Sequence, residues 1–147
     1  MPDIVGGYTY LTGRTPLPQL WTLGYHQSRW GYDSADCIKK VAGKYRELDI
    51  PCDTMHFDID YMDGYRVFTW NEKDYGDPAE TIQELADDGF KAVCIIDPGV
   101  KLDPGYEKYD EGIAGDYFAK TPEGEVYVNA VWPGDLSLIH ISEPTRH

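Results

Sequence analysis

The chain has few basic residues, and this scarcity limits what it can bind. Lysine and arginine together number 13 against 26 aspartates and glutamates, which gives the 147 residues a formal net charge of −13. A surface of that sign repels phosphate backbones and anionic membrane surfaces. We therefore expect neither a nucleic acid nor a membrane as a partner, and the sequence predicts no particular oligomeric state.

Cysteine is scarce as well, and long apolar runs are absent. The three cysteines, Cys37, Cys52 and Cys94, are an odd and widely spaced set, so they indicate neither a disulfide framework nor a Cys-x-x-Cys metal motif. No run approaches the roughly 20 apolar residues of a membrane-spanning helix. The first residues lack the basic start and the apolar segment of a signal peptide, and the sequence predicts no localisation.

The length of the chain restricts the possible folds. A closed (β/α)8 barrel usually takes about 250 residues, whereas 147 residues make one domain of ordinary size. Hydrophobic residues at 41% and aromatic residues at 14% are typical of a globular chain with a sizeable core. The sequence therefore predicts a folded domain that is too short for a whole barrel of this kind.

Three mostly apolar runs predict strands. They span residues 21–26, 53–58 and 91–97, and each is followed by polar or turn-forming residues. The run at 91–97 is apolar at nearly every position, which is typical of a parallel strand that is buried on both faces. We therefore expect a parallel sheet.

Two segments between these runs predict helices. In residues 34–48 the apolar positions recur at helical spacing, with charged residues on the opposite face. A second helix is predicted at residues 78–88, because Asp77 can cap its start and Glu80 follows three residues later. Gly89 fits the left-handed position that often closes a helix.

The alternation of strands and helices is that of an α/β fold, and polar residues gather where the strands end. They are His26 and Arg29 after the first strand, Asp58 and Asp60 after the second, and Asp97 after the third. Because the C-terminal ends of parallel strands meet at one edge, we expect these side chains to share a site. The first strand lacks the Gly-rich turn of a dinucleotide-binding fold, which favours a barrel. Each aspartate taken alone is equally well explained as the cap of a turn.

The acidic residues allow more than one chemistry. Asp58-Ile59-Asp60 has the spacing with which two carboxylates hold a divalent ion and a nucleotide diphosphate, so a metal-dependent glycosyltransferase is one alternative. His56 has no second histidine at a workable spacing, and we assign no metal site. Carbohydrate cleavage fits better, since it uses carboxylates in two protonation roles and sugars lie on flat aromatic faces. Aromatic residues follow the strand ends at Trp30, Tyr61, Tyr65, Phe68 and Trp70.

Several strings in the chain resemble landmarks of glycoside hydrolase family 31, which contains α-glucosidases and α-xylosidases. The first is Gly24-Tyr-His-Gln-Ser-Arg-Trp-Gly-Tyr32, preceded by Leu11-Thr-Gly-Arg-Thr-Pro-Leu-Pro18. The others follow in the family's order as Asp58-Ile-Asp-Tyr-Met-Asp63, Phe68-Thr-Trp70, Ile95-Ile-Asp-Pro98, Tyr109-Asp-Glu-Gly112 and Val131-Trp-Pro-Gly134. An ordered set of this kind is highly specific.

The resemblance implies a retaining α-glycosidase without a cofactor, acting on an α-linked oligosaccharide, glucoside or xyloside. It assigns Asp58 to the hydroxyls of the sugar at the cleavage point. The walls of that subsite are assigned to Trp30, Ile95 and Trp132, and the supporting positions are His26, Arg29, Asp60, Tyr61 and Asp97. The family's nucleophile stands in a Trp-x-Asp-Met-Asn-Glu context that this sequence lacks. We therefore expect the chain to contribute binding residues and to be inactive alone.

The resemblance also divides the chain. Residues 1–20 are expected to be a lead-in from a missing N-terminal β-sandwich, and residues 21–134 an incomplete (β/α)8 TIM barrel of about three βα units. Residues 135–147 depart from the family and resemble translated sequencing-adapter read-through, so we expect a non-native tail there. A freestanding, non-catalytic carbohydrate-binding module is the alternative function if three units fold without partners.

Overall fold

The computed structural model of the chain describes residues 1–97, 99–131 and 134–138. The helices are α1 (Pro2–Thr12), α2 (Ala35–Glu47), α3 (Glu72–Tyr75), α4 (Pro78–Asp87) and α5 (Glu107–Ala114), with the short 3-10 helices η1 (Leu20–Leu23), η2 (Ile59–Tyr61) and η3 (Asp63–Tyr65). The strands are β1 (His26–Gln27), β2 (Thr54–Phe57), β3 (Lys91–Cys94), β4 (Gly99–Lys101), β5 (Asn129–Val131) and β6 (Gly134–Leu138). Strands and helices alternate from β1 to β3, as the predicted α/β class requires. None of the helices in these ranges is long and apolar enough to cross a membrane.

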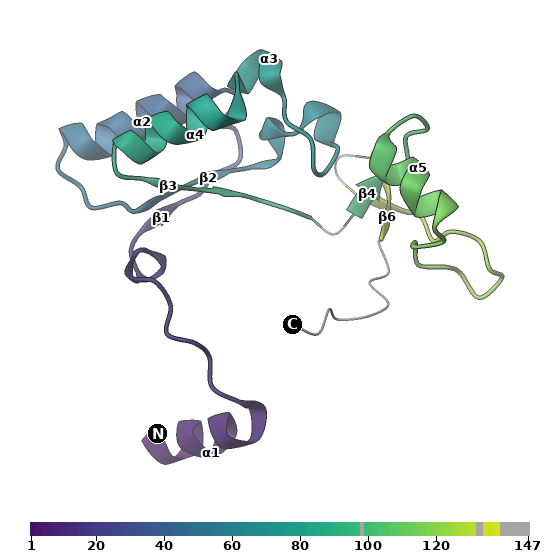
Figure 1. Cartoon of the computed structure of the whole chain (residues 1–147), viewed down its shortest axis with the longest axis horizontal. Coiled ribbons are helices and arrows are strands. Elements are labelled where there is room, and N and C mark those ends of the chain that lie inside the picture. Colours follow the sequence, from purple (N-terminus) through teal and green to yellow (C-terminus); the bar gives the residue numbers. More distant parts are fainter. Residues whose placement is uncertain (98, 132–133, 139–147) are drawn as a thin grey trace.

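Strands β1, β2 and β3 form a parallel sheet in that order. β2 pairs with β3 along its full length, from Thr54 opposite Lys91 to Phe57 opposite Cys94. Helices α2 and α4 cover one face of this sheet (Figure 1). Met55 and Phe57 of β2 belong to the hydrophobic core and are fully buried. The parallel order brings the C-terminal ends of the three strands to one edge, as predicted.

Helix α2 confirms the helix predicted at residues 34–48. The Ser34 side chain accepts a hydrogen bond from the Cys37 amide at 3.3 Å and caps the first turn. Ile38 and Ala42 lie one helical turn apart on the apolar face, and both are buried. Burial of this face holds the helix on the sheet.

Helix α4 confirms the second predicted helix, including its start and end signals. The Asp77 side chain accepts a hydrogen bond from the Glu80 amide at 3.0 Å. Gly89 has a φ of 80°, a left-handed conformation that costs glycine least. Phe90 then returns to the core and is buried. The local cap chemistry therefore sets both ends of this helix.

The strand predicted at residues 21–26 is largely wrong. Residues 20–23 form η1, and only residues 26–27 pair with β2. The Thr22 amide donates to the Gln19 carbonyl at 3.0 Å, which curls the chain instead of extending it. Leu23 is 70% exposed, so burial does not hold the apolar run in an extended form.

The third predicted strand is parallel to β2, as expected, but it is shorter and more exposed than predicted. β3 ends at Cys94, and Ile96 is 56% exposed. Just beyond β3, the Ile95 amide still donates a hydrogen bond to the Phe57 carbonyl at 3.0 Å. The pairing ends there because the chain leaves β2 at Asp58 and turns into η2. Within the described ranges β3 pairs only with β2, and its side chains are exposed or half-buried.

A second, antiparallel sheet follows β3, with the order β4-β6-β5. Helix α5 lies beside it (Figure 1). β6 falls largely within the range 135–147, where we expect a tail, and it pairs Val100 of β4 with Ser137. Helix α1 lies within the expected lead-in 1–20 and buries none of its residues. Neither observation tests the two predicted boundaries, which stay predictions.

Candidate functional site

Asp58 lies at the C-terminal end of β2, where the chain leaves the sheet. Its carboxylate accepts a hydrogen bond from the Ile59 amide at 2.8 Å, which caps η2, and the residue is half-buried. No other hydrogen bond to this carboxylate occurs among the described residues. A carboxylate has more acceptor positions than this cap uses, so Asp58 can also accept from a ligand.

Asp60 lies on η2 and is held by a tyrosine. Its Oδ1 accepts a hydrogen bond from the Tyr65 hydroxyl at 3.4 Å. Burial, and then the charge of Asp60, raise the pKa of Tyr65 above its ordinary value. The phenol therefore stays protonated at neutral pH and remains a donor. The contact joins η2 to η3 and holds the carboxylate of Asp60, which is two residues after Asp58 in the chain.

Tyr61 connects the ends of β2 and β3. Its ring is 5% exposed, and its hydroxyl donates to the Ile95 carbonyl at 2.9 Å. Burial, and then the charges of Cys94 and Asp97, raise the pKa of Tyr61 to about 12. The hydroxyl is therefore a donor throughout the physiological range. This tether fixes the Ile95 backbone beside the loop that carries the two aspartates.

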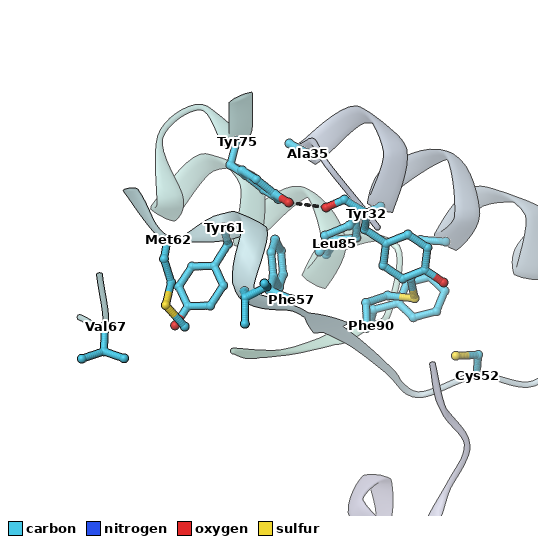
Figure 2. Packing of buried hydrophobic residues seen from close by; sticks show 14 of the residues in the cluster. Tyr32, Ala35, Cys52, Phe57, Tyr61, Met62, Val67, Tyr75, Leu85 and Phe90 are labelled. Atoms are coloured by element: carbon cyan, nitrogen blue, oxygen red, sulfur yellow. Dashed lines mark hydrogen bonds between the residues drawn. The ribbon is translucent and has the colours of Figure 1, made fainter. Parts of the chain in front are cut away.

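An aromatic cluster of Phe57, Tyr61 and Trp70 packs against η2. Tyr61 packs on Trp70 with ring centres 5.4 Å apart, and Phe57 packs on Trp70 at 5.5 Å. The Tyr75 hydroxyl donates to the Tyr32 carbonyl, which joins α3 to the residues before α2 (Figure 2). Large rings with a satisfied polar group make a stiff support. In this structure Trp70 therefore packs within the fold.

Two histidines meet on the sheet face opposite the helices. His26 Nδ1 and His56 Nε2 are 3.1 Å apart, so one ring donates a hydrogen bond to the other. His56 alternates along β2 with the buried Met55 and Phe57, which places it on the other face. His26 Nε2 is buried without a hydrogen-bond partner in the described part of the chain. Burial, and then His26, lower the pKa of His56. No local spacing predicted this partner for His56, because the contact joins residues 30 positions apart.

The remaining predicted site residues are scattered around this edge. Arg29 and Trp30 lie on the loop between β1 and α2, and Trp30 is 69% exposed. Ile95 is 38% exposed, and Asp97 is half-buried beyond β3. Trp132 lies outside the described residues. The structure thus gathers the residues of η2, Asp58 and Ile95, and it leaves Trp30 on an exposed loop.

An ion pair that the sequence did not predict joins the next loop, residues 63–69, to Asp103. Arg66 Nε donates to Asp103 Oδ2 at 2.9 Å, and Arg66 Nη1 donates to the Asp63 carbonyl at 3.2 Å. A cavity of about 440 Å³ lies between residues 63–69 and the start of α5. Arg66 and Asp103 are far apart in the chain, so no local spacing signals their contact. The sequence signal for this loop was its aromatic residues, Tyr65 and Phe68 with the adjacent Trp70, which favoured a sugar-binding site nearby.

The site as a whole is suited to binding hydroxyl groups. It combines two half-buried carboxylates with an apolar side chain and a fixed backbone, and a hydrogen bond to a charged acceptor is stronger than a neutral one. In the residues that the structure describes, no three His, Cys, Asp or Glu side chains are grouped so that they could hold a metal ion.

The chain is similar to known proteins in both sequence and structure. The family model of the glycosyl hydrolases family 31 TIM-barrel domain matches residues 15–147. Alpha-glucosidase 2 of Bacillus thermoamyloliquefaciens is 48% identical over 132 residues, which are 90% of this chain and 17% of that protein.

Two solved structures are similar over nearly the whole chain. The family 31 alpha-glucosidase of Bacteroides thetaiotaomicron superposes with a TM-score of 0.85 at 37% identity and covers 97% of this chain and 24% of its own. The heterodimeric complex of ER glucosidase II superposes with a TM-score of 0.87 at 38% identity and covers 93% of this chain and 15% of its own. The chain therefore spans less than a quarter of the length of these proteins.

Proposed function

The chain belongs to glycosyl hydrolase family 31, and we propose that it is a segment of a retaining α-glycosidase that hydrolyses α-linked glucosides or xylosides. Its fold is part of a TIM barrel. The similar proteins named above are α-glucosidases, and the proposal concerns the complete enzyme of which this chain is a part. Membership of a hydrolase family favours this reaction over the sugar transfer considered for Asp58-Ile59-Asp60.

The observation that carries the proposal is the hydrogen bond between Tyr61 and Ile95. It holds the end of β3 beside the loop of Asp58, at the edge where the C-terminal ends of the parallel strands meet. Enzymes with this barrel carry their active sites at that edge. A carboxylate beside an apolar wall supports recognition of a sugar, because a sugar presents both hydroxyl groups and an apolar ring face.

Each predicted site residue has a binding role in this proposal. Asp58 accepts hydrogen bonds from hydroxyls of the sugar at the cleavage point. The walls of the subsite are Trp30, Ile95 and Trp132, and the supporting residues are His26, Arg29, Asp60, Tyr61 and Asp97. The family's Trp-x-Asp-Met-Asn-Glu motif is absent from the 147 residues. Glycoside cleavage needs two catalytic carboxyl groups, so we propose that the chain alone is inactive.

The experiment compares the isolated chain with the complete enzyme. The complete enzyme is expected to release nitrophenol from a p-nitrophenyl α-glucoside or α-xyloside and to leave the β-glucoside intact, whereas the isolated chain releases none. In the complete enzyme, Asp58→Ala is expected to lower kcat/KM by roughly one to two decades, because a hydrogen bond to a charged group contributes about 1.5–3 kcal/mol.

Asp58→Asn separates ligand binding from helix capping. The amide oxygen of asparagine still accepts from the Ile59 amide, so the fold is retained while the charge is lost. We expect Asp58→Asn to keep the thermal midpoint and to lower kcat/KM. If Asp58→Ala leaves kcat/KM within about twofold, Asp58 is only a cap. The proposal fails if the complete enzyme cleaves no α-glycoside, or if the isolated chain cleaves one and Asp58→Asn abolishes the activity.

A further inference from the structure

A cavity opens one loop beyond the aspartates, between residues 63–69 and residues 103–108. Its volume is about 440 Å³, within the range of about 300–1,000 Å³ typical of small-molecule sites. The first wall follows η2 after β2, and the second leads from β4 into α5. The first wall leaves the parallel sheet after the C-terminal end of β2, where Asp58 also lies, whereas the second wall comes from β4 of the antiparallel sheet. We call this space the rim cavity.

Direct contacts hold the two walls of the rim cavity together. Arg66 Nε donates to Asp103 across the cavity floor at 2.9 Å, and the buried Tyr106 hydroxyl donates to the Val67 carbonyl. Within the first wall, the Thr69 hydroxyl donates to the Arg66 carbonyl at 2.6 Å. A cavity with walls fixed in this way loses little conformational freedom when it binds a ligand.

Phe68 gives the rim cavity an exposed aromatic face. The residue lines the cavity and is 59% exposed, although burying a phenyl ring away from water is favourable. Its φ is 62°, a left-handed conformation that is rare for a bulky residue. The loop therefore holds an apolar ring at the surface in a conformation that the residue does not favour. A flat ring in this position offers a stacking surface to a ligand.

The polar groups of the rim cavity carry both signs of charge. Carboxylates come from Asp63, Asp103 and Glu107, and cations come from Arg66 and Lys108. Because carboxylates outnumber cations, an anionic ligand such as a phosphate is repelled more than it is attracted. Lys108 pairs with Glu107 at 2.9 Å, so donors and acceptors lie side by side. A neutral ligand with many hydroxyl groups can use both.

We propose that the rim cavity is a distal subsite that binds a neutral sugar unit of an oligosaccharide, with Phe68 as its stacking face. The inference rests on the proposed function, because it takes the substrate to be an α-linked oligosaccharide. Asp63 stands five residues after Asp58, and five residues of chain span at most roughly 18 Å. The cavity therefore begins within reach of a short oligosaccharide whose first sugar is bound at Asp58.

The experiment measures how chain length changes the effect of removing the Phe68 ring in the complete enzyme. Phe68→Gly deletes the ring and suits the positive φ, so the fold is not put at risk. Phe68→Trp retains an aromatic face. Tyr117→Ala is the matched control, because Tyr117 is 57% exposed and lies beyond the other end of α5, outside the cavity. Substrates are a p-nitrophenyl α-glycoside and α-linked oligosaccharides of increasing length.

Phe68→Gly is expected to raise KM for the longer oligosaccharides by roughly threefold to tenfold, the loss of one aromatic contact. KM for the p-nitrophenyl substrate stays within about twofold, Phe68→Trp restores the longer substrates, and Tyr117→Ala changes neither. An effect of equal size on every substrate, or none on any, overturns the subsite. An enzyme that cleaves no α-glycoside refutes the proposed function, whereas cleavage that is insensitive to Phe68→Gly refutes only the subsite.

Discussion

His56 shows how the surroundings of a single residue create a dependence on pH. Its imidazole is half-buried and meets the His26 ring at 3.1 Å. Burial, and then His26, lower the pKa of His56 below its ordinary value of 6.5. As the pH falls through 6.5, the unfolded chain takes up a proton at this residue before the folded protein does. Proton uptake by the unfolded chain favours unfolding.

We therefore predict that stability is highest above about pH 7 and falls as the pH drops through 6.5 toward the lowered pKa of His56. The measurement is the thermal midpoint of the complete enzyme at about pH 7.5 and about pH 5.5. His56→Gln keeps a hydrogen-bonding side chain at the His26 ring and does not titrate, so it should shrink the difference between the two midpoints. An unchanged difference would contradict the assignment to His56.

Residue patterns predicted the carboxylates of the candidate site but not the contacts that surround them. Asp58 and Asp60 were predicted because they directly follow an apolar run, and strand ends of this kind meet at one edge. Two of these contacts join residues more than 30 positions apart. They are the hydrogen bond from Tyr61 to Ile95 and the ion pair of Arg66 with Asp103. Such contacts depend on how far each loop folds back over the sheet, and no local spacing encodes that distance.

At the scale of elements, helix α4 tests whether local cap chemistry sets a helix start. The Asp77 side chain accepts from the Glu80 amide at 3.0 Å. We predict that Asp77→Ala lowers the free energy of unfolding by about 1 kcal/mol, the usual loss on removing such a cap. Asp77→Asn retains the acceptor and is the matched control. Equal losses for alanine and asparagine, measured by thermal or urea unfolding, would show that the hydrogen bond is not what stabilises the helix.

The two predicted helices lie where they were expected, whereas one of the three predicted strands is largely wrong, and the reason for this difference is physical. The caps and apolar stripes of α2 and α4 act between residues at most four positions apart, so the sequence displays them directly. A strand forms only when a partner strand lies beside it. The run at 21–26 has the composition of a strand, yet only its last residue pairs with β2, together with Gln27. The three-residue strands β4 and β5 show no periodicity that could have predicted them.

At the scale of the whole molecule, much apolar surface remains uncovered. β1 and β3 pair only with β2 among the described strands, so both edges of the parallel sheet present unpaired backbone groups. An apolar groove of about 440 Å³ runs along α2 and is lined by residues that include Val41 and Leu48. Leu23 is 70% exposed and Ile96 56%. A closed barrel covers such edges and faces with further strands and helices.

We predict that the isolated 147-residue chain self-associates or is molten in solution, because open edges pair with those of another copy. The net charge of −13 slows this association but does not prevent it, since the screening length at physiological salt is only about 8 Å. Removing residues 136–147 should not restore a monomer, because both edges of the parallel sheet remain. The measurement combines sedimentation, thermal unfolding and amide chemical-shift dispersion. A monomer with one sharp, cooperative unfolding transition and native-like dispersion would overturn the prediction, and it would favour a carbohydrate-binding module that folds on its own.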